Sequence, residues 1–424
     1  MTELMPPELA KACTEVRLAQ PDDAVAGQPA RFVATPASTQ ETAALLRAAA
    51  GLHLSVVPRG SGSRIGWAPR PRACDLIVET RRLDQVIEHA AGDLVVTVQP
   101  GVLLDELQGK LAAEGQRLAL DPPGGGTIGG ILATGVAGPL RFRFGAPRDL
   151  LIGITVVIAD GTIAKAGGKV VKNVAGYDLG KLYAGSYGTL GLITQATFRL
   201  HPAPAAGAAV SIDCPGPGEA EFAARTIAGS PLAPSAVEFD WPSADAAITV
   251  TALLEGDEQS VQERSERMRG LLQGGDVEVA AGPFRLGRAR LGGPASTLLR
   301  VAVWPGQVAR ALDAIRTAAS EHGLDPAISG SAAGVLDVSL VQESLAADVA
   351  GFVTALRAGL GELASALPGM PPSVASAVVL DAPAAVRDAV DMWGPVPSLD
   401  LMRAVKNQFD PDHRMAPGRF AGGI

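Results

Sequence analysis

Cysteine is scarce in this sequence: Cys13, Cys74 and Cys214 are the only three among 424 residues. They form no CxxC pair, so the sequence lacks the spacing that holds an iron–sulfur cluster or a zinc ion. Three isolated cysteines fit a reducing compartment, where structural disulfides are rare. We therefore expect any metal cluster that works with this protein to lie on another chain.

An excess of positive charge is also missing, because 36 Lys and Arg stand against 44 Asp and Glu, a formal charge of −8. Nucleic acid is therefore not an expected partner. The longest clean apolar run, residues 150–159, is well short of the roughly 20 residues that span a bilayer. The N-terminus does not have the pattern of a secretory signal. We expect a cytoplasmic protein, which reaches the inner face of the plasma membrane only peripherally, through a partner.

Glycine, by contrast, is abundant, with 50 residues. It is concentrated in three stretches beside apolar runs: residues 57–66 (VPRGSGSRIG), 121–138 (DPPGGGTIGGILATGVAG) and 169–194 (KVVKNVAGYDLGKLYAGSYGTLGLIT). Glycine lets backbone amides approach a ligand closely and point the same way. Several such loops in one domain indicate a large cofactor that carries phosphate, which we interpret as FAD.

The length predicts more than one domain, since domains usually have about 100–200 residues. Strand-like and helix-like segments alternate up to the small, proline-containing segment 203–207, which we take as a boundary. Two similar groups of strands and helices follow it, and they predict an α+β domain, ferredoxin-like in pattern, with helices on one face of an antiparallel sheet. The expected domains are 1–205, 206–395, and a C-terminal segment 396–424 that returns to the first domain.

Hydrophobic periodicity and capping signals predict individual elements in both domains. Ser38 and Glu41 have the spacing of a capping box before a helix that runs to residue 50. The other expected elements of the first domain are strands at 54–58, 94–98, 150–159 and 191–200 and a helix at 102–114. Those of the second are strands near 208–212, 237–240, 248–254, 298–303 and 335–341, helices at 219–228, 259–272, 308–322 and 346–363, and a strand then a helix in 374–390.

The first two glycine stretches each leave alternatives open. In the first, Gly60 and Gly62 form either a nest of N–H groups around a diphosphate or an ordinary strand-to-helix turn. The second contains GxGxxG at 124–129, but prolines interrupt the strand that a Rossmann fingerprint needs, and Asp149 precedes a strand instead of ending one. Walker A fails because Gly130 stands where lysine is required. What remains is either a loop that lies along a flat ring or a plain packing loop.

The third stretch has glycine at every third position: Gly185, Gly188 and Gly191. A tight turn against a ligand explains this spacing, and so does a short glycine helix packed on its neighbour. Four polar or charged residues lie just upstream, at Lys172, Tyr177, Asp178 and Lys181. Tyr177 is a candidate only, because a buried tyrosine is usually a hydrogen-bonded core residue.

Taken in order, the motifs PRGSGS, GGGTIGG and KNVAGYDLGKLYAGSYGTLGLITQATFRL resemble the FAD-binding domain of the vanillyl-alcohol oxidase (PCMH-type) flavoprotein superfamily. Within it, the sequence is most similar to the E-type subunits of bacterial glycolate oxidases. The resemblance covers about half of the chain and implies an FAD-binding domain of two α/β subdomains with FAD extended between them. The second domain resembles the cap of that superfamily only in pattern.

The resemblance also implies which residues bind FAD. The diphosphate would be wrapped by Pro58, Arg59, Gly60, Ser61, Gly62 and Ser63. The flavin and its chain would run beside Gly124, Gly125, Gly126, Thr127, Ile128, Gly129, Gly130 and Thr134. The adenine side would meet the backbone of Gly188, Gly191 and Ile193. Relatives that attach flavin covalently have histidine in place of Ser63, so this FAD is expected to be noncovalent. The wider family commonly has asparagine at two positions that are Gly135 and Ala416 here. The polar contacts that those asparagines make are therefore not carried over to this chain.

Catalytic 2-hydroxyacid dehydrogenases that resemble this chain carry a paired-histidine HxGDGNxH motif, which holds a divalent metal. Here the five histidines are far apart, at His53, His89, His201, His322 and His413. The sequence therefore predicts no metal site, and no residue is assigned as catalytic. His201 and His413 are expected to be surface or packing residues.

These observations favour an FAD-binding subunit of a multi-subunit glycolate (2-hydroxyacid) oxidase or dehydrogenase. By resemblance, its partners would be a catalytic flavin subunit (D-type) and an iron–sulfur subunit (F-type), and it would meet the hydroxyacid only indirectly. Two alternatives stay open. One is a stand-alone FAD-dependent oxidoreductase that acts on a small 2-hydroxyacid, and the other is a scaffold subunit that has lost FAD.

Overall fold

The computed structural model describes residues 4–168, 178–272, 277–281, 296–340, 344–365 and 375–424. Contacts divide the chain into two compact units. The first comprises Met1–Val136, Ala146–Ala203 and Ser398–Ile424, and the second comprises Ala137–Gly145 and Pro204–Pro397. Segment 137–145 was expected in the first domain, but its contacts place it in the second unit. Leu140 and Phe144 pack against Ala236 and Leu253 of the second unit, which gives this segment an apolar core there.

The first unit begins with a small mixed sheet in the order β1-β4-β6-β5. Its strands are β1 (Val16–Leu18), β4 (Phe32–Ala34), β5 (Val56–Arg59) and β6 (Leu76–Glu79), of which β4, β6 and β5 are parallel. Helix α2 (Thr39–Gly51) connects β4 to β5 and begins at the predicted cap, where the Glu41 N–H donates to Ser38 Oγ at 3.0 Å. Helix α1 (Pro7–Ala12) contacts α2, and Leu9, Leu45 and Leu46 are fully buried in this core.

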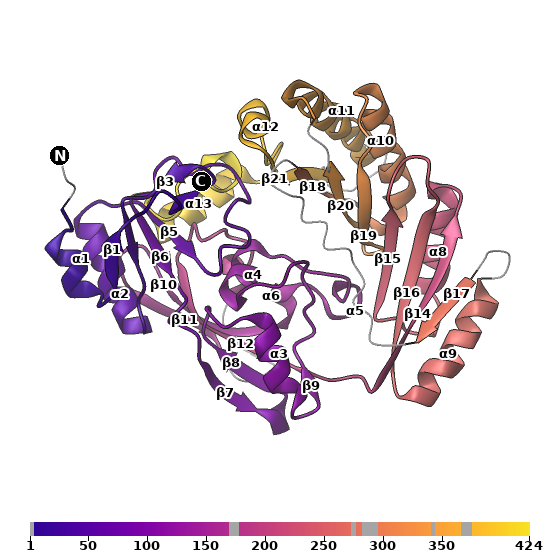
Figure 1. Cartoon of the computed structure of the whole chain (residues 1–424), viewed down its shortest axis with the longest axis horizontal. Coiled ribbons are helices and arrows are strands. Elements are labelled where there is room, and N and C mark those ends of the chain that lie inside the picture. The colour runs from indigo at the N-terminus through magenta and orange to yellow at the C-terminus, as the bar shows by residue number, and fades with distance from the viewer. Residues whose placement is uncertain (1–3, 169–177, 273–276, 282–295, 341–343, 366–374) are drawn as a thin grey trace. The chain divides into compact units, whose positions relative to one another are not determined.

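The second sheet of this unit is antiparallel, in the order β11-β10-β12-β8-β7 (Figure 1). Its strands are β7 (Val86–Ala90), β8 (Val95–Val98), β10 (Leu151–Val157), β11 (Ile163–Gly167) and β12 (Leu192–Arg199). Helix α3 (Leu104–Ala112) buries Leu104, Leu107 and Leu111, the face that the leucine spacing predicts. The two sheets correspond to the two expected α/β subdomains. The smaller elements are β2 (Ala24–Val25), β3 (Gln28–Pro29), η1 (Ala91–Asp93), β9 (Gln116–Arg117), α4 (Ile128–Thr134), α6 (Pro147–Leu150), α7 (Gly180–Tyr183), β13 (His201–Pro202), α13 (Leu399–Phe409) and η4 (Ala421–Gly423).

The second unit contains an eight-stranded antiparallel sheet in the order β17-β14-β16-β15-β19-β20-β18-β21. Its strands are β14 (Ala206–Cys214), β15 (Ala236–Trp241), β16 (Ile248–Gly256), β17 (Val277–Ala281), β18 (Thr297–Ala302), β19 (Ala327–Ser331), β20 (Val335–Leu340) and β21 (Ser376–Asp381). Each half follows a β-α-β-β-α-β order, and in each half the fourth strand lies beside the first. That is a ferredoxin-like arrangement repeated twice, so the predicted fold class is confirmed.

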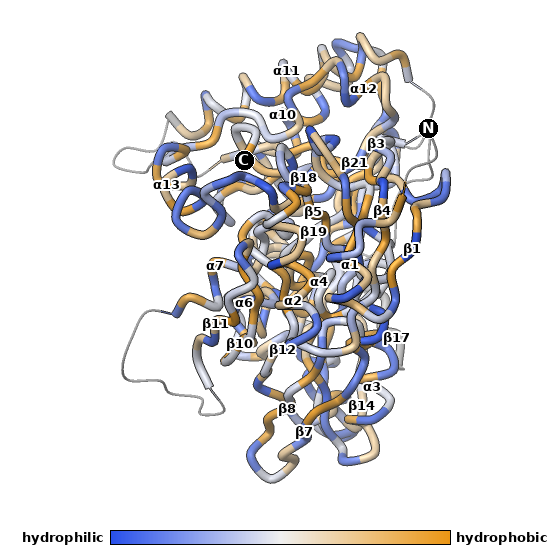
Figure 2. The backbone as a smooth tube through the Cα atoms, turned by 90° about the vertical axis from the view of Figure 1, so that its left-hand side faces the viewer, coloured by the Kyte–Doolittle hydropathy of each residue, from blue (hydrophilic) through white to orange (hydrophobic). Residues whose placement is uncertain are grey.

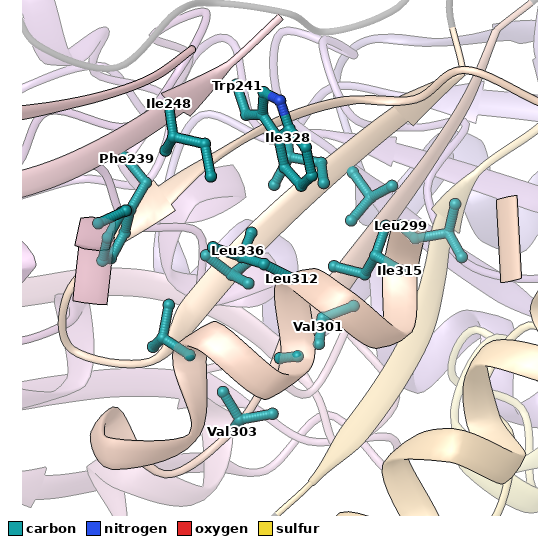
Figure 3. Close-up of a cluster of buried hydrophobic side chains, with 14 of the residues drawn as sticks. Phe239, Trp241, Ile248, Leu299, Val301, Val303, Leu312, Ile315, Ile328 and Leu336 are labelled. Atoms are coloured by element: carbon teal, nitrogen blue, oxygen red, sulfur yellow. The ribbon is translucent and has the colours of Figure 1, made fainter. Parts of the chain in front are cut away.

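Helices of the second unit cover a common apolar core. They are α5 (Arg141–Phe144), α8 (Pro217–Ala228), α9 (Glu258–Leu271), η2 (Pro305–Gln307), α10 (Val308–Glu321), α11 (Ala346–Ser365) and α12 (Ala384–Ala389). Figure 3 shows Leu312 and Ile315 of α10 beside Leu299, Val301 and Leu336 of the sheet. In Figure 2 the coils of α10 and α11 alternate between hydrophilic and hydrophobic colours, as amphipathic helices do. Among the described residues, we find no helix whose length and hydropathy would let it cross a bilayer.

Candidate functional site

A hollow in the first unit brings together segments that are far apart in the sequence. It is lined by Val57, Pro58, Arg59, Gly60, Ser61, Gly62, Ser63, Arg64, Ile65, Thr127, Gly130, Ala133, Thr134, Tyr187 and Arg419. Its volume is about 70 Å³. Whole small-molecule sites usually measure about 300–1,000 Å³, so the hollow fits a group such as a phosphate and not a complete dinucleotide.

The first glycine loop leaves β5 and lies directly against the beginning of α4. A Cβ atom on Gly60 would stand 2.2 Å from Thr127 Oγ1, so only glycine allows this approach. Thr127 caps α4 by accepting from the Gly130 N–H at 3.3 Å, and Gly62 has the positive φ of 78°. The loop also makes a turn, in which the Ile65 N–H donates to the Gly62 carbonyl at 3.0 Å, and the nest around a diphosphate stays a prediction.

The two arginines of this loop do not play the same part. Arg59 contacts Asp23 at 2.6 Å and Glu79 at 2.7 Å, so its guanidinium is ion-paired within the protein. Arg64 is 6% exposed and donates to the Gly125 carbonyl at 2.8 Å and to the Pro123 carbonyl. It therefore fastens the first glycine loop to the second. The sequence showed its charge, but nothing in the sequence indicated its partners.

Sequence reasoning missed one aromatic and one cationic residue of the hollow, Tyr187 and Arg419. Tyr187 has the positive φ of 54°, which is uncommon for a residue with a side chain and often marks a functional site. Its N–H donates to the Ala133 carbonyl at 2.8 Å, which ties it to α4. Arg419, from the C-terminal segment, donates to the Ile65 carbonyl at 3.0 Å and to the Trp67 carbonyl. The C-terminal segment thus forms one wall of the hollow.

Several predicted cofactor residues lie outside the lining: Gly124, Gly125, Gly126, Ile128, Gly129, Gly188, Gly191 and Ile193. Three of their glycines are explained by close packing within the protein. A Cβ on Gly126 would lie 2.9 Å from Arg64 Nη1. A Cβ on Gly129 would lie 2.6 Å from the Pro100 Cβ, and a Cβ on Gly191 would lie 2.8 Å from the Val157 carbonyl oxygen. A packing role is therefore sufficient for these three, and their contact with FAD stays a prediction.

The third glycine stretch forms turns, so a glycine helix is not what occupies residues 185–191. A Cβ on Gly188 would lie 3.2 Å from the ring of Pro58, which places this turn beside the first loop. Ile128 and Ile193 are buried at 1% and 7% exposure, in α4 and β12. Of the residues upstream, Asp178 and Lys181 form an exposed ion pair at 3.2 Å, whereas Lys172 and Tyr177 lie outside the described residues.

The second loop also contains a helix that the sequence analysis did not expect. Residues 128–134 form α4, although its sequence IGGILAT has two glycines. Its stability comes from burial of Ile128, Ile131 and Leu132 and from the Thr127 cap, since propensity alone would not favour it. The Thr134 hydroxyl donates to the Gly130 carbonyl at 2.7 Å, within the same helix.

The histidines have structural neighbours. His89 lies 3.0 Å from Gln116 Oε1, His413 lies 2.8 Å from Asn407 Oδ1, and His322 packs directly against Gly351 of α11. Across the part of the chain that the structure describes, no group of three or more His, Cys, Asp and Glu residues is placed to hold a metal ion. We assign no catalytic residue.

The cysteines are expected to be unreactive towards thiol reagents in the native protein. All three are buried, and burial raises the pKa of Cys13 to about 11 and of Cys74 to about 12, and also raises the pKa of Cys214. The thiolate is the reactive form, so it is scarce at neutral pH. Labelling with a coloured disulfide reagent should detect no thiol in the native protein and three after denaturation. Rapid labelling of Cys74 in the native state would contradict the burial.

Acid is expected to destabilise the first unit through Asp23. Hydrogen bonds from Arg17 hold the pKa of this carboxyl well below its usual range, with help from Arg59. A depressed carboxyl pKa contributes stability that is present above the unfolded value of about 3.9 and is lost as the pH falls below it. Thermal unfolding between pH 7 and pH 3 should show this loss, and Asp23→Asn should be less stable at neutral pH and less acid-sensitive. If Asp23→Asn had the same pH profile of stability as the wild type, Asp23 would not be a source of the acid sensitivity.

A domain with two α/β subdomains and a phosphate-sized hollow between glycine loops defines a protein that binds a phosphate-bearing cofactor. Residues 30–167 match the family model described as "FAD binding domain". FAD is thus the cofactor of the first unit. The model covers only the first part of the chain, so it identifies this domain and not the whole protein.

Curated proteins and solved structures resemble the chain, and three of them are described here. The "Glycolate oxidase subunit GlcD" of Bacillus subtilis is 36% identical over 41% of this chain and 37% of its own length. The "Glycolate oxidase subunit GlcE" of Escherichia coli is 39% identical over 28% of this chain and 35% of its own length. The matches therefore span little more than a third of each relative. The structure of an alkyldihydroxyacetonephosphate synthase superposes with a TM-score of 0.67 at 16% identity, over 93% of this chain and 78% of that chain, which shows the shared fold.

Proposed function

We propose that this protein is an FAD-dependent oxidoreductase subunit that binds FAD noncovalently within a multi-subunit glycolate (2-hydroxyacid) oxidase or dehydrogenase. The observation that carries the proposal is the hollow between the first glycine loop and α4, in a domain whose family binds FAD. Two relatives are named as subunits of glycolate oxidases, which supports the substrate class. FAD, when bound, supplies the two-electron chemistry that oxidation of a hydroxyl group requires.

In this proposal the residues of the first unit hold and orient the cofactor. The loop 57–65 would present the backbone N–H groups of residues 60–63 to the diphosphate, and Thr127 and Gly130 of α4 would line the opposite side of the hollow. Two further chains, a D-type catalytic flavin subunit and an F-type iron–sulfur subunit, would carry the substrate site and the onward electron path. The assembly would be cytoplasmic, associated with the inner face of the plasma membrane through its partners.

The flavin is expected to be released completely when the protein is denatured. Ser63 stands in the loop where a covalent link would need a nucleophilic ring nitrogen, and its hydroxyl lies 3.4 Å from the Ser61 hydroxyl. Acid precipitation followed by absorbance of the supernatant measures the released fraction. Yellow colour that stays with the protein pellet would contradict the noncovalent assignment.

The proposed role is tested by purifying the tagged chain from its native host. We expect flavin bound to the polypeptide, a companion flavoprotein and a companion iron–sulfur protein, with glycolate turnover by the assembly and not by this chain alone. Turnover of glycolate or D-lactate with a dye acceptor by the isolated chain would favour the stand-alone oxidoreductase. A colourless protein that binds no added FAD would contradict the proposal and favour the scaffold.

A further inference from the structure

Lys406 is a charged residue that is fully buried. It lies on α13 with no exposed surface, and its ion-pair partner Asp410, one helical turn further on, is equally buried. The Lys406 ammonium donates to Asp410 Oδ2 at 2.7 Å, to the Thr189 carbonyl at 2.7 Å and to the Met415 carbonyl at 2.9 Å. These three acceptors use all three N–H donors of an ammonium group. Burial lowers its pKa, and Asp410 opposes that shift.

The carboxylate of Asp410 is satisfied by the same region of the chain. It accepts from the Arg414 N–H at 3.1 Å and from the Met415 N–H at 2.7 Å, in addition to Lys406. The backbone there pairs with β5: the Val56 N–H donates to the Arg414 carbonyl at 2.8 Å, and the Ala416 N–H donates to the Val56 carbonyl at 2.7 Å. The ion pair therefore fixes the C-terminal segment beside Val56, the first residue of the strand that leads into the first glycine loop.

The same ion pair reaches the turn that carries Tyr187. The Thr189 carbonyl is two residues from Tyr187, and Thr189 itself is tied back by its hydroxyl to the Ser186 carbonyl at 2.7 Å. Two ring contacts flank this bond. Phe409 of α13 meets Tyr183 edge to face at 5.9 Å, and Phe420 lies 6.3 Å from Tyr187. Three contacts therefore hold the turn 183–189 against the C-terminal segment.

We infer that Lys406 is a positioning residue for the FAD site. It does not line the hollow, but its bond to the Thr189 carbonyl holds Tyr187 in its strained conformation at the wall of the hollow. Through Asp410 and Met415 it also sets the path of the segment that delivers Arg419 to the same wall. The inference depends on FAD binding by the first unit and not on the oxidation of a hydroxyacid.

The test separates positioning from stability with the double variant Lys406→Met/Asp410→Asn. Removing both charges avoids an unpaired buried charge, and the asparagine oxygen still accepts a backbone N–H. The apo-protein is titrated with FAD, and with ADP as a probe that carries a diphosphate but no flavin. We expect a Kd raised about tenfold or more for both, which corresponds to about 1.4 kcal/mol. The denaturation midpoint of the apo-protein should stay near that of the wild type.

The matched control is Arg269→Met/Glu266→Gln, which neutralises an exposed pair on α9 and should change neither Kd. A folded Lys406→Met/Asp410→Asn protein that binds FAD and ADP as tightly as the wild type would overturn the inference. If the double variant does not fold, hydrogen exchange of the wild-type protein, measured with and without ADP, tests the inference instead. ADP should protect amides in 183–189 and 406–415 together with those of the first loop, and protection confined to 57–65 and 127–134 would overturn it. Neither readout requires hydroxyacid turnover, so the proposed oxidase role can fail separately.

Discussion

Replacement of Gly60 by alanine is expected to empty the FAD site. The new methyl group would stand 2.2 Å from Thr127 Oγ1 and 3.3 Å from the Thr127 Cβ, so the threonine hydroxyl cannot keep its present position. Thr127 is buried and its hydroxyl caps α4, so the substitution either removes this cap or moves the loop away from the start of the helix. We expect the Kd for FAD to rise at least about a hundredfold, or about 2.8 kcal/mol. Titration of the apo-protein with FAD, followed by flavin fluorescence, measures this.

The matched control for this substitution is Gly109→Ala. Gly109 lies in α3, in the same unit, and a Cβ there would meet nothing within 4 Å. Alanine in an exposed helix should stabilise the protein by about 0.5–1 kcal/mol and leave the Kd unchanged. If Gly60→Ala retained FAD as well as Gly109→Ala does, the hollow would not be the diphosphate site.

The single substitution Lys406→Met is expected to cause the largest loss of stability. It leaves the Asp410 carboxylate buried without its cation, and breaking a buried pair in this way typically costs about 3–5 kcal/mol. Urea denaturation should show a correspondingly lower free energy of unfolding. The change should fall in the transition of the first unit, because Lys406 and its partners all belong to it.

Two comparisons check the origin of that loss. Adding Asp410→Asn to Lys406→Met should recover a large part of the stability, because no charge then remains buried. Neutralising the exposed Arg269 and Glu266 pair should cost at most about 1 kcal/mol. A Lys406→Met protein as stable as the wild type would mean that the ion pair contributes nothing to the fold.

Much of the secondary structure was predictable because hydrophobic periodicity is strong in this chain. The expected helices at 219–228, 308–322 and 346–363 correspond to α8, α10 and α11, and the repeated order of elements indicated the ferredoxin-like halves. Shorter elements gave no such signal. The strands β4 and β6 have three and four residues, and α4 contains two glycines, so their formation depends on burial that sequence alone does not display.

The candidate site was predictable only in part, for a related reason. Glycine density identified the loop at Gly60, since a missing side chain is visible in the sequence, whereas the approach of Gly60 to Thr127 was found only in the structure. The partners of Arg64 were not visible, because its acceptors are backbone carbonyls of the second loop. Arg419 lies more than 350 residues from the loop it contacts, and its position depends on long-range contacts of the C-terminal segment, such as the pairing of Met415 with Val56.

The claim that the hollow binds the FAD diphosphate is tested most directly by a crystal structure of the protein with FAD bound. We expect both phosphorus atoms in the hollow, with phosphate oxygens within hydrogen-bond distance of backbone N–H groups in residues 60–63. Density for the diphosphate at another place on the protein, with this hollow filled by water or side chains, would contradict it.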